Sequence, residues 1–253
     1  MLTAALWGLV QGLTEFLPIS SSGHLVLVPA LLGIDEPDLA TSAVLHLGTL
    51  AAAVWYYRHD LMTAARFRTD PNGRRIVWLL AIGTIPAAIA GTTLDGPLEI
   101  VFDEPWIAAV ALVVTGLLLL ASLALPVGER RLEDGRWPDA LVVGMAQAFA
   151  LVPGISRSGM TITAGMAQGL SRVEAARYGF LLAVPAIAGA GVLEGRRLLD
   201  AGGFEPQLLV GVVVAAVTGY AAISFLVGLL ARRGMAPFAA YCIVAGTVAY
   251  FLV

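Results

Sequence analysis

Two short segments of the sequence contain the residue types that could carry out a reaction. The first segment brings together an amide, a carboxylate, three hydroxyls and an imidazole: Gln11, Glu15, Ser20, Ser21, Ser22 and His24. Ser21 and His24 could act as a nucleophile and its base, with Glu15 as the acidic partner. Gln11 and Glu15 are four residues apart and share a helical face, so their oxygens could also bind a divalent cation such as Mg²⁺ or Ca²⁺.

The second segment centres on Arg157, which lies at apparent membrane depth with Ser156, Ser158 and Thr161 around it. An arginine inside a membrane is costly and marks a functional site by default. If Ser158 caps a half-helix, Thr161 falls at the third helical position and free backbone N–H groups point toward the guanidinium. Helix N-termini and the arginine fork both bind phosphate, so this segment predicts an anion site. The alternative role of Arg157, an ion pair with Glu15, is compatible with it.

The composition indicates what must position these residues. Hydrophobic residues make up 58% of the 253 residues and charged residues only 13%, about half the charged share of ordinary soluble domains. A soluble enzyme is therefore excluded, and a net charge of −3 offers no basic face for nucleic acid. Uncharged runs at 76–94, 106–126 and 206–231 are each long enough to cross a bilayer as a helix.

The chain also repeats itself. A shift of 136 residues superposes Gly8, Gln11, Ile19, Ser20, Ser22, Gly23 and Gly33 on Gly144, Gln147, Ile155, Ser156, Ser158, Gly159 and Gly169. We therefore expect one membrane domain, 1–253, built from repeats at about 1–126 and 137–253. Each repeat begins with an apolar stretch broken at Pro18 or Pro153, which predicts a re-entrant helical hairpin.

Three candidate spans follow each hairpin: about 39–57, 76–94, 106–126, 178–193, 207–230 and 237–253. The predicted fold is an all-α polytopic membrane protein with six transmembrane helices and two re-entrant hairpins. An odd number of crossings per repeat inverts the second repeat relative to the first, as in many transporters, and brings the hairpin tips together near the midplane.

The arginines give this plan an orientation, because cytoplasmic loops are enriched in basic residues. All 15 basic residues are Arg, and 12 of them fall on one face of the six-span plan. The opposite loops, 34–38 and 95–105, contain acidic residues and no Arg. We therefore expect loop 58–75 to be cytoplasmic, both termini to be external and the first hairpin to open outward. The five tryptophans mostly lie near span ends, as in an interfacial aromatic belt.

The two polar segments resemble the signature motifs of the undecaprenyl-diphosphate phosphatase family, also called the bacitracin-resistance phosphatases. The matching stretches are Gln11-Gly-Leu-Thr-Glu15-Phe-Leu-Pro18-Ile-Ser-Ser-Ser-Gly-His24 and Pro153-Gly-Ile-Ser-Arg157-Ser-Gly-Met-Thr161. The resemblance implies hydrolysis of a polyprenyl diphosphate, the lipid carrier of cell-wall glycan synthesis, to its monophosphate outside the cytoplasmic membrane. It assigns Glu15 to an essential acid, Ser21 and His24 to the nucleophile and its partner, and Ser156, Arg157 and Thr161 to the diphosphate-binding loop.

Some alternatives stay open at this point. A transporter or flippase for a polyprenyl phosphate lipid would suit the inverted repeats, although it would not need a nucleophile and a base at Ser21 and His24. Either Ser21 or His24 could bond to phosphorus, and a homodimer is left open. His46 lies within the first candidate span and is interpreted as a group hydrogen-bonded to a neighbouring helix, outside the site.

Overall fold

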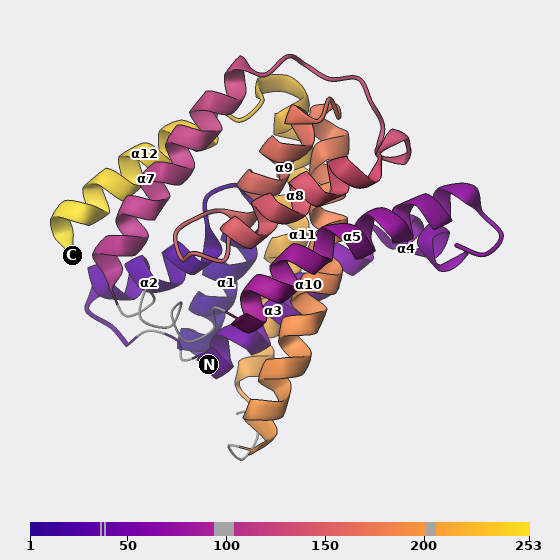
Figure 1. Ribbon diagram of the computed structural model, residues 1–253. Coiled ribbons are helices and arrows are strands. Elements are labelled where there is room, and N and C mark those ends of the chain that lie inside the picture. The colour runs from indigo at the N-terminus through magenta and orange to yellow at the C-terminus, as the bar shows by residue number, and fades with distance from the viewer. Residues whose placement is uncertain (36, 38, 94–103, 201–205) are drawn as a thin grey trace.

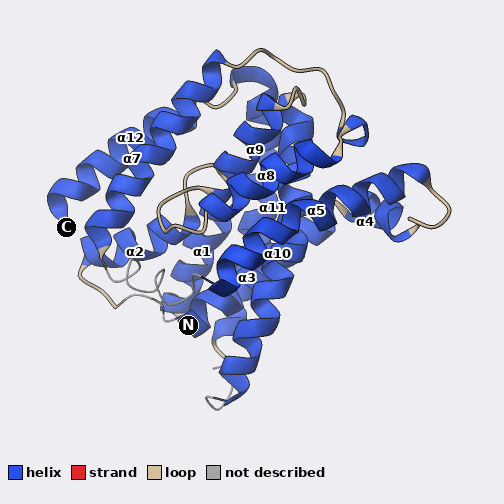
Figure 2. Cartoon of the chain, viewed as in Figure 1, coloured by secondary structure: helices blue, strands red, loops and turns tan. Residues whose placement is uncertain are grey.

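The computed structural model describes residues 1–253 apart from 36, 38, 94–103 and 201–205, and the described part contains helices but no strand (Figures 1 and 2). The helices are α1 (Leu2–Phe16), α2 (Ser21–Leu32), α3 (Leu39–Tyr56), α4 (Arg58–Ala65), α5 (Pro71–Thr93), α7 (Pro105–Ala121), α8 (Trp137–Phe149), α9 (Arg157–Ala167), α10 (Arg172–Asp200), α11 (Leu208–Arg233) and α12 (Ala236–Leu252). Short 3₁₀ turns, η1 (Ser122–Ala124) and η2 (Leu132–Asp134), lie between α7 and α8. The all-helical class predicted from the sequence is confirmed.

Among the described residues, four helical stretches are long and apolar enough to cross a membrane: Pro71–Thr93, Pro105–Ala124, Arg172–Val192 and Leu208–Arg233. They identify a multi-pass membrane protein. The other two predicted spans also coincide with helices, α3 with 18 residues and α12 with 17. Much of the predicted acidic loop 95–105 lies outside the described residues.

Two breaks interrupt the helical path where the sequence predicts them, between α1 and α2 and between α8 and α9. At the first break the Ser20 hydroxyl accepts a hydrogen bond from Gly23 N–H at 3.2 Å. At the second, the Ser156 hydroxyl accepts from Gly159 N–H at 3.1 Å. Ser156 therefore caps α9, and the expectation that Ser158 is the cap is wrong. The reason is that Ser156 has the extended backbone that a cap requires, whereas Ser158 is already in the first helical turn.

Small residues let several helix pairs approach until their backbones touch. A Cβ atom at Gly8 of α1 would overlap the carbonyl of Gly211 in α11, and one at Gly116 of α7 would lie 2.9 Å from the carbonyl of Ala239 in α12. In Figure 1, α7 and α12 run side by side along one edge of the bundle. Close backbone contact replaces hydrophobic burial as the source of helix association in a lipid environment.

An ion cluster joins the helix ends on the arginine-rich face. Arg177 in α10 donates to Asp60 of α4 at 2.5 Å, to Glu133 of η2 at 2.8 Å and to Glu174 of its own helix at 2.9 Å. Burial raises the pKa of Glu133, but hydrogen bonds and the Arg177 charge outweigh it and hold that pKa below its usual value. Loop 58–75 and the segment before α8 therefore lie on the same face, as the arginine pattern predicts.

Candidate active site

The Glu15 carboxylate is the centre of the polar site. It is 4% exposed and accepts hydrogen bonds from Gln11 Nε2 at 3.0 Å, Ser21 Oγ at 2.5 Å and Arg157 Nη2 at 2.5 Å. Gln11 lies one turn before Glu15 on α1, Ser21 begins α2, and Arg157 begins α9. The structure thus brings the acid and the hydroxyl of the first break to the guanidinium of the second. The ion pair with Glu15 is one of the two roles predicted for Arg157, and it is compatible with the other, the binding of an anion.

Arg157 keeps hydrogen-bonding capacity after pairing with Glu15. Its Nη1 atom is buried and has no partner among the described residues. The first N–H groups of α9 also lack the carbonyl partners that the helix interior provides. A buried guanidinium donor beside a helix N-terminus is suited to an anion such as a phosphate group.

The serines on either side of the breaks hold the two tips together. Ser158 Oγ donates to the Leu17 carbonyl at 3.0 Å, and Ser20 Oγ donates to the Ile155 carbonyl at 3.5 Å. Within each tip, paired hydroxyls lie 3.3 Å apart at Ser20 and Ser22 and 3.2 Å apart at Ser156 and Ser158. Ser20 and Ser158, which together with Gln11, Ser22, Ser156 and Thr161 are expected from the sequence to bind substrate, thus join the two tips.

Thr161 has a different environment from the one expected. Its hydroxyl donates to the carbonyls of Arg157 at 2.9 Å and Ser158 at 3.3 Å, and the residue is fully buried. Since Ser156 rather than Ser158 is the cap, Thr161 lies one turn into α9. Its hydroxyl is therefore turned toward the backbone of its own helix, and the structure does not bring it to the Arg157 guanidinium.

His24 is placed near Ser21 in sequence, but the two side chains form no hydrogen bond with each other. The Nδ1 atom of His24 lies 2.7 Å from the Ser20 carbonyl, and its Nε2 atom lies 2.7 Å from the Tyr241 hydroxyl of α12. Because a carbonyl only accepts, Nδ1 carries a proton, and Nε2 of the neutral ring accepts from Tyr241. The hydroxyl of Ser21 is bonded to Glu15 instead. Nothing in the sequence around Tyr241 indicates this contact.

His46 belongs to the site, contrary to its interpretation from sequence. Its Nε2 atom lies 3.6 Å from Glu15 Oε2, while Nδ1 is 2.7 Å from the Ser42 carbonyl of its own helix, α3. The expected hydrogen bond to a neighbouring helix is absent from the described interactions of this side chain. The only signal in the sequence was an imidazole within an apolar run, which does not show what faces it across the helix interface.

Each tip is also held by a helix outside its hairpin. Thr115 of α7 donates to the Gly154 carbonyl at 2.9 Å and accepts from Ser156 N–H at 3.1 Å. Cys242 of α12 is fully buried and lies 3.6 Å from the Pro18 carbonyl. The paired helices α7 and α12 therefore fix the positions of both breaks at once.

The residues expected to bind a divalent cation offer few free oxygens. Among the described residues, no group of three or more His, Cys, Asp and Glu side chains could hold a metal. Both Glu15 oxygens already accept from donors, one of them the Arg157 cation. The buried Gln11 Oε1 atom, in contrast, has no partner in the described structure. These two side chains alone do not form a resident metal site.

These observations define a helical integral-membrane protein whose polar centre joins a buried acid, a hydroxyl and a guanidinium. The family model described as bacitracin resistance protein BacA matches residues 4–248. The chain belongs to this family. Similar proteins include the undecaprenyl-diphosphatase of Myxococcus xanthus, 44% identical over 98% of this chain and 87% of the relative. Those of Trichlorobacter lovleyi and Rubrobacter xylanophilus are 42% and 44% identical, over 97% and 95% of this chain and 94% of each relative.

Proposed function

We propose that this protein is an integral-membrane phosphatase that hydrolyses undecaprenyl diphosphate to undecaprenyl monophosphate and so recycles the lipid carrier. The family and the names of its similar relatives support this activity. The observation that carries the proposal within the structure is the contact of Ser21 and Arg157 with the same carboxylate, Glu15. A hydroxyl held by an acid beside a cation is the arrangement that phosphoryl transfer needs.

In the proposed reaction, the Ser21 oxygen attacks the terminal phosphorus and its proton passes to Glu15. The bond between that phosphorus and the bridging oxygen breaks, and the lipid monophosphate leaves. Water then cleaves the phosphoserine and releases phosphate. Arg157 Nη1 and the start of α9 stabilise the charge on the phosphoryl oxygens, where one such donor is typically worth about 10²- to 10³-fold in rate. His24, held by Ser20 and Tyr241, positions the start of α2.

His46 can serve as a second acceptor for the proton that Ser21 releases to Glu15. The Ser42 carbonyl fixes the proton of a neutral His46 ring on Nδ1, so that the lone pair of Nε2 faces Glu15. A proton received by Glu15 from Ser21 can pass to this nitrogen, which restores the carboxylate for the hydrolytic step. The His46 side chain is 32% exposed, and this exposure connects the buried acid with the outside of the bundle.

A divalent cation, where one takes part, would use Gln11 Oε1 and Glu15 together with oxygens of the diphosphate itself. It would neutralise part of the diphosphate charge. Because Glu15 is the only carboxylate of this pair, we expect the cation to arrive with the substrate. Phosphate release from a polyprenyl diphosphate by purified protein in detergent tests the phosphatase activity. The same assay with and without EDTA tests whether a divalent cation takes part. Binding of the lipid with no phosphate release would contradict the enzyme and favour a transporter.

We propose six spans with two re-entrant hairpins in the cytoplasmic membrane, and a site that opens to the external face. The helices at all six predicted positions and the arginine-rich face support this topology. Single cysteines in loops 58–75 and 95–105, in a Cys242→Ala background, should label from opposite sides with a membrane-impermeant thiol reagent. Labelling of both loops from outside would refute the inverted arrangement.

A further inference from the structure

A basic hollow lies between the beginnings of α5 and α8, away from the Glu15 site. Its volume is about 770 Å³, and its lining includes Arg74, Arg75, Trp78, Arg136 and Trp137. The two helices pack along one another, and their N-terminal turns come together on the arginine-rich face. No residue of this hollow takes part in the catalytic proposal.

The arginine side chains of this hollow are left without an acidic partner. Arg74, Arg75 and Arg136 form no ion pair with described residues. The acids at the two helix starts are engaged by other donors: Asp70 Oδ1 accepts from the N–H groups of Asn72 and Gly73, and Asp139 Oδ2 accepts from Arg136 N–H at 2.8 Å and pairs with Arg130 at 2.6 Å. These carboxylates offset the positive helix N-termini, so the three guanidinium groups are available to an anion.

Two exposed tryptophans place the hollow at the membrane surface. Trp78 is 63% exposed and Trp137 is 65% exposed, as expected for side chains of an interfacial belt. Trp7, in contrast, is buried in the core at 3% exposure, so not every tryptophan serves this belt. The wall of the hollow continues from the arginines to Leu79 and Ile82, which are apolar. A lining that combines arginines with apolar side chains suits an amphiphilic ligand better than a free ion.

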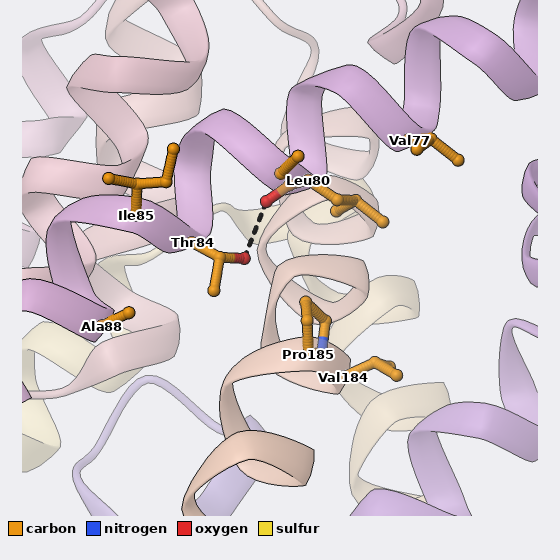
Figure 3. Close-up of a pocket in the computed structure, with 8 residues that line it drawn as sticks. Val77, Leu80, Thr84, Ile85, Ala88, Val184 and Pro185 are labelled. Carbon is orange, nitrogen blue, oxygen red and sulfur yellow. Dashed lines mark hydrogen bonds between the residues drawn. The ribbon is translucent and has the colours of Figure 1, made fainter.

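Another face of α5 provides an internal contrast. Val77, Leu80, Thr84 and Ile85 line an apolar groove against Val184 and Pro185 of α10 (Figure 3). The only hydroxyl among these side chains, that of Thr84, donates to the Leu80 carbonyl at 2.7 Å. This groove offers nothing to a charged group, whereas the basic hollow offers two guanidinium groups from α5 and a third from Arg136, the N-cap of α8.

We propose that the hollow between α5 and α8 binds the anionic headgroup of a membrane phospholipid. The arginines contact the phosphate, since guanidinium groups match phosphate oxygens in a bidentate way. Trp78 and Trp137 lie at the level of the glycerol backbone, and the acyl chains follow the apolar wall into the bilayer. Basic pockets between transmembrane helices are a recurrent form of anionic lipid recognition.

The test is a titration of the detergent-solubilised protein with phosphatidylglycerol or phosphatidylcholine, followed by native mass spectrometry. The pocket variant combines Arg74→Gln, Arg75→Gln and Arg136→Gln. The control variant combines Arg66→Gln, Arg68→Gln and Arg232→Gln, which removes the same charge from exposed positions outside the hollow. Each pocket arginine should contribute about fivefold to phosphatidylglycerol affinity, so the pocket variant should bind this lipid about 10²-fold more weakly. The control should change by less than twofold.

Several outcomes would overturn the proposal: equal weakening in both triple variants, undiminished phosphatidylglycerol binding by the pocket variant, or equal affinity of the wild type for phosphatidylcholine. Displacement of the lipid by millimolar inorganic phosphate would assign the hollow to a free anion. At least tenfold preference for a polyprenyl monophosphate would assign it to the product. Single Arg→Gln variants preserve the test where the triple variant does not fold.

Discussion

The two helix breaks share a serine cap but carry different reactive side chains. Each is capped by a serine that accepts from the glycine three residues later, and each has a second serine hydroxyl beside the first. At the equivalent positions, however, Glu15 corresponds to Leu151, and Ser21 corresponds to Arg157. The first break therefore supplies the acid and the hydroxyl, and the second supplies the cation. The capping hydrogen bond is common to both repeats, although Ser20 has a φ of 66° and Ser156 a φ of −78°, and the reactive groups are divided between the two breaks.

Gln11 and Gln147, which occupy equivalent positions in the two repeats, also differ in their hydrogen bonding. Gln11 donates to Glu15, whereas both amide atoms of Gln147 are buried without a partner among the described residues. The difference follows from one substitution, because the residue four positions after Gln147 is Leu151 rather than an acid. The same residue type thus occupies the equivalent position of both repeats but has a hydrogen-bond partner only in the first.

The largest effect should come from the first break. Ser21→Ala removes the attacking oxygen and should lower phosphate release by at least about 10³-fold. His24→Ala should cost less, because His24 contacts Ser20 and Tyr241 rather than Ser21. Radiolabelled substrate should trap an acid-stable phosphoserine. The reverse ranking, with an acid-labile phosphohistidine, would make His24 the nucleophile.

Arg157→Lys tests the cation of the second break. The lysine keeps the charge but loses the planar fork, so it cannot pair with Glu15 and a phosphoryl group in the same geometry. We expect turnover to fall by about 10²- to 10³-fold while the protein still inserts and keeps its melting temperature within a few degrees. Near-normal turnover would show that Arg157 serves only as an ion-pair partner.

His46→Gln should have an intermediate effect, because it removes a proton acceptor rather than the nucleophile. We expect kcat to fall by about 10- to 100-fold, at the lower end of general acid–base contributions. His59→Gln on exposed α4 is the control. Steady-state assays of both variants in the same detergent make the comparison, and near-normal kcat in His46→Gln would exclude His46 from proton transfer.

The smallest effect on activity is expected from the two glutamines, and it should differ between them. Gln11→Leu removes a hydrogen bond to a charged group and should lower activity by about tenfold. Gln147→Leu removes a buried amide without partners, and should leave activity unchanged and raise the melting temperature. Activity assays and thermal melting in the same detergent make the comparison. Loss of activity in Gln147→Leu would place chemistry in the second break that its contacts do not indicate.

Sequence periodicity predicted most of the helices and the point at which the breaks meet. The four-residue spacing of Gln11 and Glu15 also predicted their shared face, and the 3.0 Å hydrogen bond between them confirms it. These features depend on local chain geometry and on apolar run length, both of which are visible in one sequence.

Features that depend on packing between distant helices could not be predicted in this way. His46 lies 3.6 Å from Glu15 because α3 packs beside α1, and the sequence does not specify which face of α3 turns toward it. The contact of Tyr241 with His24 joins residues 217 positions apart. The choice between Ser156 and Ser158 as the cap depends on backbone angles that either serine could have adopted.

The contacts made by α12 set the order in which the site can be completed during synthesis. Tyr241 and Cys242, which hold the first break, lie on the last helix along the chain. They emerge 84 residues after Arg157, which corresponds to a delay of about 4–17 s at ordinary translation rates. Pro18 and His24 therefore enter the membrane long before the two groups of α12 that contact them. Until α12 has been synthesised, the first break can be held only by its contacts with earlier helices.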